Sequence, residues 1–218
     1  MAGFSNYSAL AFGDWSSGKT AMPAVTTRYL ALLTAVTANG GGVTEASFTG
    51  YARVPVPAAD WNSTSGTDPS TTVTNATASF AASTQSTSQT VVAWALYDAA
   101  TGGNLIRGDW LGNCPWFPFT ATLASPGVIT APGITAGSTP NLADGSLVIV
   151  DAGYGGALPG GLVNATQYTV AGLASDSFNV GVDTTTAGSG MVRQIVPMVI
   201  SYNTAVNFAA GALTLTQI

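Results

Sequence analysis

The residues whose types and spacing most suggest chemistry form an octapeptide, Gly13–Thr20 (GDWSSGKT). It has the pattern of a phosphate-binding loop, in which backbone N–H groups hold phosphates, Lys19 neutralises them and Thr20 ligates Mg²⁺. Such a loop must lead into a helix of several turns, because the helix N-terminus faces the phosphates. Pro23 lies four residues after Lys19 and would break that helix in its first turn. We therefore interpret the match as fortuitous, a turn before the first strand, and predict no nucleotide or other cofactor.

The dipeptide Asp-Trp occurs three times, as Asp14-Trp15, Asp60-Trp61 and Asp109-Trp110. An exposed Trp beside a carboxylate suits sugar binding, with the ring against a pyranose face and the carboxylate on its hydroxyls. Alternatively, the Trp closes a core edge or an oligomer interface, where aromatic residues are enriched, while the Asp accepts from turn amides. We favour the second interpretation and take Trp15, Trp61 and Trp110 as candidate interface residues.

A dense aromatic and proline cluster occupies Asn113–Phe119 (NCPWFPF). Pro115 and Pro118 are expected to prevent a regular central strand there. The cluster is then either an irregular plug in the core or an exposed adhesive patch, and the sequence leaves both open. Trp116 and Phe117 are further candidate interface residues.

The composition excludes several classes of site. The chain of 218 residues contains no His and one Cys, and only 7% of its residues are charged. Without His it has no Ser-His-Asp catalysis of the usual kind, and with one Cys it has no usual zinc site. A paired-carboxylate glycosidase is not excluded by counting, but no two acids have a spacing that suggests partnership. We predict no enzyme, no catalytic residue and no metal.

The charge balance also bears on partners. Five Lys and Arg residues and a net charge of −5 argue against nucleic acid, whose binding depends on neutralising phosphates. The N-terminus lacks the pattern of a signal peptide, and the sequence has no apolar run of membrane-spanning length. Because hydrophobic residues reach 46%, we expect a folded, β-rich protein with a neutral surface rich in Thr and Ser.

The elements that must position these residues are mostly strands. Apolar runs and alternation predict strands over Thr27–Ala35, Phe48–Val56, Thr72–Phe80, Thr90–Tyr97, Asn104–Leu111 and Ala212–Thr216. A short helix is predicted over Asn6–Phe12, with Ser5 as its N-cap.

The composition changes after these strands. Residues 125–140 are rich in Pro and Gly, which predicts a linker or an irregular crossover. Short strands are then expected over Ser146–Val150, Gln167–Val170, Ser177–Val182 and Met191–Ile195, forming a small β-module. We predict an all-β fold: an antiparallel β-sandwich or jelly-roll-like body formed by residues 1–112 and 200–218, and a second, small β-domain inserted at 113–199 with its lead-in at 125–140.

Four separated segments resemble a known family. They read ALAFGDW…TRYLALLTA, TEASFTGYARVPVP, VVAWALYDAATGGNLI and VNFAAGALTLTQ, and they occur in the family's order. They are similar to small virion proteins of tailed bacteriophages, described as head-decoration or tail-fibre proteins. The resemblance covers residues 5–112 and 200–218, and the inserted segment is similar to β-modules of other phage structural proteins.

The resemblance implies a structural protein of the virion, made in the bacterial host cytoplasm. We expect a capsid decoration or cement protein on the phage head surface, which binds the major capsid protein and forms a homotrimer or dimer. The alternative is a tail-fibre or receptor-binding protein that contacts host glycans through the insert and the Asp-Trp residues. A phosphate-loop enzyme is disfavoured, and neither nucleic acid nor membrane is an expected partner.

Overall fold

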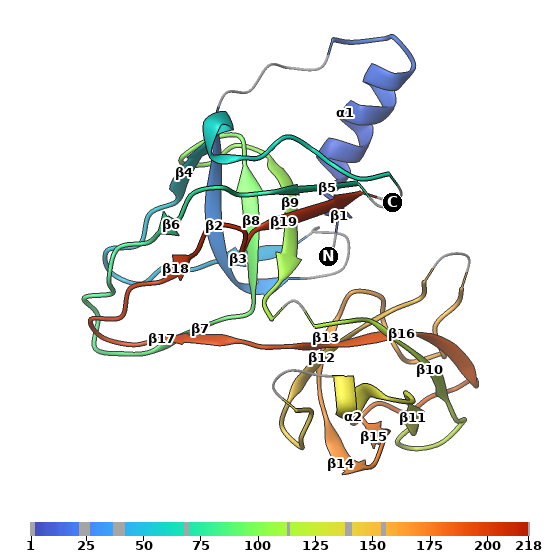
Figure 1. Ribbon diagram of the computed structural model, residues 1–218. Helices are drawn as coiled ribbons and strands as arrows, with labels where there is room; N and C mark the ends of the chain where they lie inside the picture. The colour runs from blue at the N-terminus through green and yellow to red at the C-terminus, as the bar shows by residue number, and fades with distance from the viewer. Residues whose placement is uncertain are drawn as a thin grey trace. The chain divides into compact units, whose positions relative to one another are not determined.

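The computed structural model describes residues 3–21, 27–36, 42–67, 70–112, 114–137, 141–153 and 156–217. The chain forms two compact units: unit 1 comprises residues 1–35, 39–109 and 198–218, and unit 2 comprises residues 36–38 and 110–197. Strands dominate both units, and the pairings of neighbouring strands with a defined register are antiparallel. The predicted all-β class with a short N-terminal helix is confirmed (Figure 1).

Unit 1 is built on a six-stranded sheet in the order β1-β9-β8-β2-β3, with β4 also paired to β2. Its strands are β1 (Gly3–Phe4), β2 (Thr27–Val36), β3 (Val43–Glu45), β4 (Val54–Pro57), β8 (Ala93–Tyr97) and β9 (Leu105–Trp110). The apolar runs in β2 and β8 form its centre. Leu30, Leu32 and Leu33 are fully buried, as expected of a strand with apolar residues on both faces.

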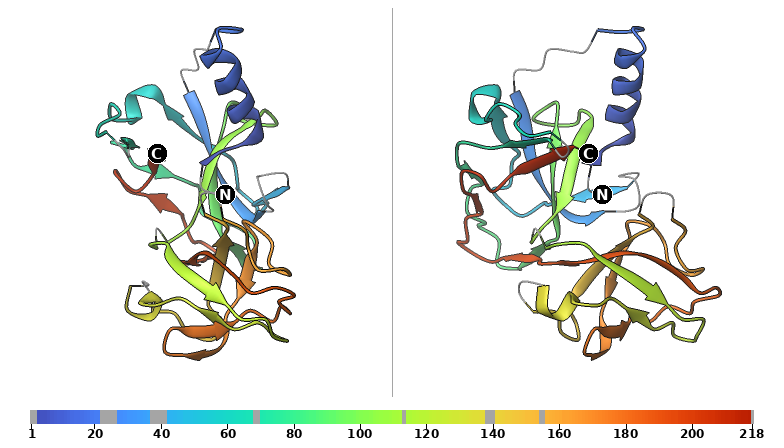
Figure 2. Two further views of the ribbon diagram at one scale, coloured as in Figure 1. Left: turned by 90° about the vertical axis from the view of Figure 1, so that its right-hand side faces the viewer. Right: turned by 45° about the vertical axis from the view of Figure 1, so that its right-hand side comes forward.

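The C-terminal segment of the chain pairs with residues 70–91 in three short antiparallel ladders. They pair β19 (Thr214–Gln217) with β5 (Ser70–Val73), β18 (Asn207–Phe208) with β6 (Ala78–Ser79), and β17 (Met198–Ile200) with β7 (Gln89–Val91). The ladders form a second layer of unit 1, visible in the left view of Figure 2. The layers meet at both edges, where β4 contacts β6 and β1 contacts β19. Between them Phe80 packs against Phe208 and stacks on Tyr51.

Helix α1 (Asn6–Ser16) follows β1 and is longer than predicted. Its predicted N-cap is confirmed, because the Ser5 hydroxyl accepts a hydrogen bond from the N–H of Ser8 at 3.2 Å. The first turn is fixed to β9, since Ser5 N–H and the Ser8 hydroxyl both donate to the carbonyl of Ile106. Beyond this turn, α1 stands away from the strands of unit 1 (Figures 1 and 2).

Unit 2 is a seven-stranded antiparallel sheet in the order β13-β12-β16-β10-β11-β15-β14. Its elements are β10 (Phe117–Ala121), β11 (Ile129–Thr130), α2 (Ile134–Gly137), β12 (Leu147–Asp151), β13 (Gln167–Thr169), β14 (Ala171–Ala174), β15 (Ser177–Asn179) and β16 (Gly188–Ile195). One apolar core joins these strands, and Val148, Val150, Val192 and Ile134 are fully buried within it.

Two long strands predicted in unit 1 are wrong. Over Phe48–Val56 the chain first turns, with Tyr51 N–H donating to the carbonyl of Phe48, and β4 begins only at Val54. Thr72–Phe80 is divided between β5 and β6. In both segments the alternation of residue types continues through a turn, so the pattern alone did not show where pairing stops.

Of the two interpretations of residues 125–140, a linker or an irregular crossover, the linker is wrong. This segment contains β11 and α2, and its Ile129 and Ile134 are buried in the core of unit 2. The end of the segment, residues 138–140, lies outside the described residues, as do Pro23 and Asn113.

Proline does not keep the end of the segment 113–119 out of the sheet, contrary to the prediction, although residues 114–116 belong to no strand. Pro118 lies within β10, opposite Met191 of β16. The second neighbour of β10, strand β11, begins its pairing only at Thr120. Pro118 has no N–H to donate, but β11 does not pair with β10 at this position and requires no hydrogen bond there. Pro118 can therefore lie within β10.

Candidate functional site

The phosphate-loop-like octapeptide Gly13–Thr20 lies at the wrong end of a helix for phosphate binding. It contains the last turn of α1 and the residues that follow. Ser17, Gly18 and Lys19 donate their backbone N–H groups to the carbonyls of Gly13, Trp15 and Asp14 at 3.1, 2.9 and 2.9 Å. These donors are engaged by the helix C-terminus, whose partial charge is negative. The octapeptide therefore lacks the helix N-terminus that a phosphate-binding loop requires.

The three Asp-Trp dipeptides lie on three separate elements. Trp15 is in the last turn of α1, half exposed, with its ring centre 5.4 Å from that of Phe12. Trp61 is partly buried and follows the short 3-10 helix η2 (Ala58–Asp60). Trp110 ends β9 and is only 3% exposed, so the chain itself covers most of its surface. Of these rings, Trp15 presents the most surface to a partner.

The remaining two candidates belong to unit 2. Trp116 is partly buried, and the guanidinium carbon of Arg193 lies 4.9 Å from its ring centre. Phe117 packs against the core of unit 2 and lies directly over Gly137. With Cys114 and Phe119 also buried, the described part of the cluster 113–119 is largely buried rather than an exposed patch, but its end forms β10 and is not an irregular plug.

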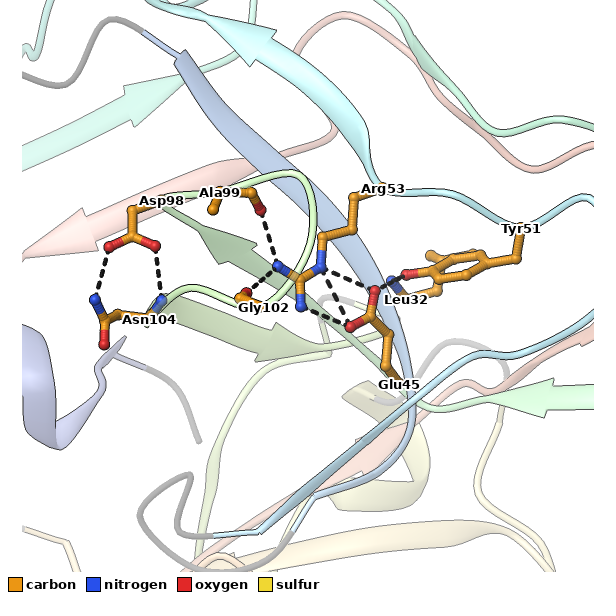
Figure 3. Close-up of polar contacts among 8 residues, drawn as sticks. All are labelled: Leu32, Glu45, Tyr51, Arg53, Asp98, Ala99, Gly102 and Asn104. Atoms are coloured by element: carbon orange, nitrogen blue, oxygen red, sulfur yellow. Dashed lines mark hydrogen bonds and ion pairs between the residues drawn. The ribbon is translucent and has the colours of Figure 1, made fainter.

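Among the described residues, unit 1 contains an extended polar arrangement that no motif of the sequence indicated. We call it the Arg53 cluster: Leu32, Glu45, Tyr51, Arg53, Ala99 and Gly102 (Figure 3). Arg53 donates from Nε and Nη2 to the Glu45 carboxylate, at 2.8 Å for the shortest contact, and from Nη1 to the carbonyls of Ala99 and Gly102 at 2.9 and 2.7 Å. Its guanidinium carbon lies 3.5 Å from the centre of the Tyr97 ring. A single side chain thus joins β3, the start of β4 and the turn after β8.

Tyr51 completes the cluster from the opposite side of the carboxylate. Its hydroxyl donates to Glu45 Oε1 at 2.7 Å and accepts from Leu32 N–H at 3.1 Å. Burial acts to raise the pKa of Glu45, but hydrogen bonds from Arg53 and Tyr51 outweigh it, so this pKa lies below its ordinary value. Burial and the bond to Glu45 raise the pKa of Tyr51 well above its ordinary value. The cluster therefore holds an ionised carboxylate and a neutral phenol.

The turn that supplies the two carbonyls is itself fixed by a carboxylate. Asp98 accepts from the backbone N–H of Asn104 at 2.6 Å and from its side-chain amide at 2.9 Å. Gly103 has a φ of +70°, and a side chain there would collide with Asp98 and Ala99. The segment DAATGGN therefore forms the turn that directs carbonyl oxygens at Arg53. The cluster braces three segments of the chain, and its protein-facing donors and acceptors suit a structural role.

Unit 2 carries a recess of about 580 Å³ over one part of its sheet. Its lining includes Pro118, Phe119, Pro132 and Met191, with the hydroxyl residues Thr120, Thr130 and Ser189. None of the lining residues that the structure describes is ionisable. The recess can accept an uncharged group with apolar faces and hydroxyl edges.

Within the described ranges, His, Cys, Asp and Glu form no group of three or more that could hold a metal ion. Among the same residues, no helix combines the length and apolar character needed to cross a membrane.

Residues 3–112 match the family described as podophage GP4 fiber I protein gp80. The chain belongs to this family. The match spans half of the chain and includes α1, the six-stranded sheet and the Arg53 cluster. It ends at Gly112, so residues 113–218 lie outside it. A search of curated proteins finds no match. Membership makes the chain a structural protein of the phage virion, as the resemblance of its four segments implied.

Proposed function

We propose that the chain is a structural component of the phage tail fibre. The observation that carries this proposal is the family match over residues 3–112, because the family is described as a fibre protein. The same match favours the tail-fibre alternative over capsid decoration. Capsid decoration was the function expected from the sequence. The internally satisfied Arg53 cluster agrees with a structural part, since its polar groups are bonded within the chain.

Labelling of intact virions tests the location. We expect antibodies against the chain to decorate the tail in electron micrographs, and quantitative mass spectrometry to give a few to a few tens of copies per particle. Label spread over the head, with hundreds of copies, would instead support a decoration protein bound to the major capsid protein.

A second function is favoured by the recess in unit 2, which we propose as a contact site for a neutral host glycan. Sugar rings have apolar faces and hydroxyl edges, and the lining offers prolines, Phe119 and Met191 beside three hydroxyl residues. The described residues of this lining carry no cation that could pair with an acidic sugar, which favours uncharged sugars. This location differs from the Asp-Trp residues proposed on sequence grounds.

A glycan array with the full chain tests this site. Thr120→Arg would place a long cation in the recess from an exposed position, and Thr169→Arg adds the same charge at an exposed position of β13 that does not line it. We expect Thr120→Arg to abolish binding and Thr169→Arg to retain it. Binding lost in Trp61→Ala but kept in Thr120→Arg would transfer the glycan site to the Asp-Trp residues.

A further inference from the structure

The sheet of unit 2 carries a row of four hydroxyl side chains, one on each of the neighbouring strands β16, β10, β11 and β15. The four residues of this hydroxyl row lie in register and are Ser189, Thr120, Thr130 and Ser177. Phe119, Ile129 and Phe178, which adjoin three of them in sequence, are buried in the core of unit 2. Because successive side chains of a strand point to opposite faces, the hydroxyl row lies on the outer face of the sheet.

Most of the hydroxyl row lies in the recess already described. Ser189, Thr120 and Thr130 line it, and Ser177 continues the row beyond the described lining. The hydroxyl oxygens of Thr130 and Ser177 are 3.1 Å apart and share a hydrogen bond. A hydroxyl group can donate once and accept twice, so both retain capacity for a ligand.

An apolar row runs beside the hydroxyl row and consists of Met191, Pro118 and Pro132, which also line the recess. Pro118 of β10 lies opposite Met191 of β16, and Pro132 follows Thr130 by two residues on the same side of the chain. Both prolines are exposed. A ligand that lies across these strands therefore meets hydroxyl groups along one side and apolar groups along the other.

The spacing of the hydroxyl row suits a chain of sugar rings. Neighbouring strands lie about 4.8 Å apart, so four strands span about 14 Å. In an extended chain of β-1,4-linked hexoses, each ring advances by nearly the same distance as one strand spacing. Such a chain laid across the strands would place one ring at each hydroxyl group. The twist of about 20–25° per strand limits this match to a few rings.

The charges near the two rows favour an uncharged chain. Asp151 of β12 lies opposite Met191, and Asp176 immediately precedes β15. Arg193 of β16 is only 5% exposed, and its guanidinium lies over the ring of Trp116. The two carboxylates are thus more accessible than the cation, and they would repel an acidic polysaccharide.

We propose that the recess and the hydroxyl row bind the interior of a neutral, extended, β-1,4-linked hexose polysaccharide. The polysaccharide runs across the strands, with one ring on each of β16, β10, β11 and β15. This inference rests on the glycan function proposed for the recess, and it adds the class of the glycan and its direction on the sheet.

Calorimetric titration of the full chain with oligomers of defined length tests the class. The probes are β-1,4-linked oligomers of glucose, mannose and N-acetylglucosamine, from one to six rings. We expect at least one series to bind, with affinity rising by about three- to tenfold per ring up to four rings and then levelling off. Maltohexaose is the control, because its α-1,4 linkages curve the chain, and it should bind at least tenfold more weakly than the best β-1,4 hexamer. Absence of binding by all three series, affinity independent of length, or equal binding of maltohexaose would each overturn the proposal.

Substitutions along the hydroxyl row test the direction. Ser177→Ala should remove the gain in affinity from three rings to four and leave the affinity for the trimer unchanged. Thr120→Val keeps a β-branched side chain but removes a central hydroxyl group, so it should weaken trimer and tetramer alike. Thr169→Val is the matched control at an exposed position of β13 outside the row, and it should change neither. A tetramer that still gains affinity in Ser177→Ala would contradict a chain running across the strands.

The failure of this inference can be distinguished from the failure of the glycan function itself. Binding of a single terminal sugar on the glycan array, lost in Thr120→Arg, would keep the recess as a glycan site and overturn the extended chain. Absence of binding to every glycan would overturn both.

Discussion

Two parts of unit 1 use their side chains in opposite ways. The Arg53 cluster directs its donors and acceptors at partners inside the chain, and the Arg53 side chain is only 8% exposed. Helix α1 presents its largest apolar side chains to solvent and is fixed to β9 through its first turn. Both parts lie within the family match, so membership of the family does not distinguish them.

The comparison separates the residues that maintain the fold from those available to a partner. The segments GYAR and DAATGGN, which are part of the resemblance, build the Arg53 cluster, and substituting their residues should destabilise unit 1. Substituting the exposed residues of α1 should leave unit 1 folded. The following predictions test this division.

Arg53→Met should have the largest effect on stability. The variant leaves the Glu45 carboxylate without its cation and removes the donor to the carbonyls of Ala99 and Gly102. Removing one partner of a buried ion pair costs about 3–5 kcal/mol, and we expect a value near 3 because Glu45 is 27% exposed. Urea denaturation of the full chain measures this loss.

A double variant separates the ion pair from packing. Replacing both partners of a buried pair by apolar side chains is often nearly neutral. Glu45→Met with Arg53→Met should therefore be more stable than Arg53→Met alone. If the double variant is the less stable protein, the unpaired carboxylate is not the cause of the loss.

Tyr51→Phe should cost less, about 1–3 kcal/mol, the range for an unsatisfied buried polar group. It removes the acceptor of Leu32 N–H and one donor to Glu45, while the ring keeps its stacking on Phe80. Tyr202→Phe removes a hydroxyl from an exposed ring and should change stability by less than about 0.5 kcal/mol. Equal effects of the two variants would show that the Tyr51 hydroxyl contributes nothing.

Acidification should destabilise unit 1 through Glu45. Its pKa is lower in the folded chain than the ordinary value of 4.5, so its contribution is complete above that pH and is lost as the pH falls through the folded pKa. Burial acts to raise the pKa of Asp98, but its bonds to Asn104 outweigh burial and lower this pKa, so the contribution of Asp98 is complete above the ordinary value of 3.8 and is lost at lower pH. Urea midpoints measured from pH 7 to pH 3 should decrease once the pH is below the ordinary pKa of Glu45. Glu45→Gln should make this decrease with pH shallower. An unchanged slope would place the acid sensitivity elsewhere.

Local patterns were sufficient to predict some elements of the fold. The apolar run of β2, the strands β9 and β12 and the Ser5 cap were close to their observed positions, because each depends on neighbouring residues. The end of α1 was predicted too early. Gly18, with a φ of +75°, was the available stop signal, but the phosphate-loop pattern led us to expect a turn there.

The Arg53 cluster could not be found in the same way. Arg53 is 8 residues from Glu45 and 46 from Ala99, so the contacts exist only after β3, β4 and β8 have come together. One signal was present: Glu45 is the only Glu of the chain and Arg53 one of few cations, so a pairing between them was a reasonable guess. Similarly, the burial of Ile129 and Ile134 depends on distant strands, which the Pro and Gly content around them concealed.

Lys19→Ala should have the smallest effect and sharpens the contrast between the two parts of unit 1. Lys19 and Asp14 form a pair as Arg53 and Glu45 do, but at 4.0 Å and with side chains 73% and 53% exposed. Water screens such a pair, so its loss should change stability by less than about 0.5 kcal/mol. Thermal unfolding with and without Mg-ATP should give the same midpoint for wild type and variant. Stabilisation by Mg-ATP that disappears in Lys19→Ala would mean that Gly13–Thr20 binds phosphate despite its position at a helix C-terminus.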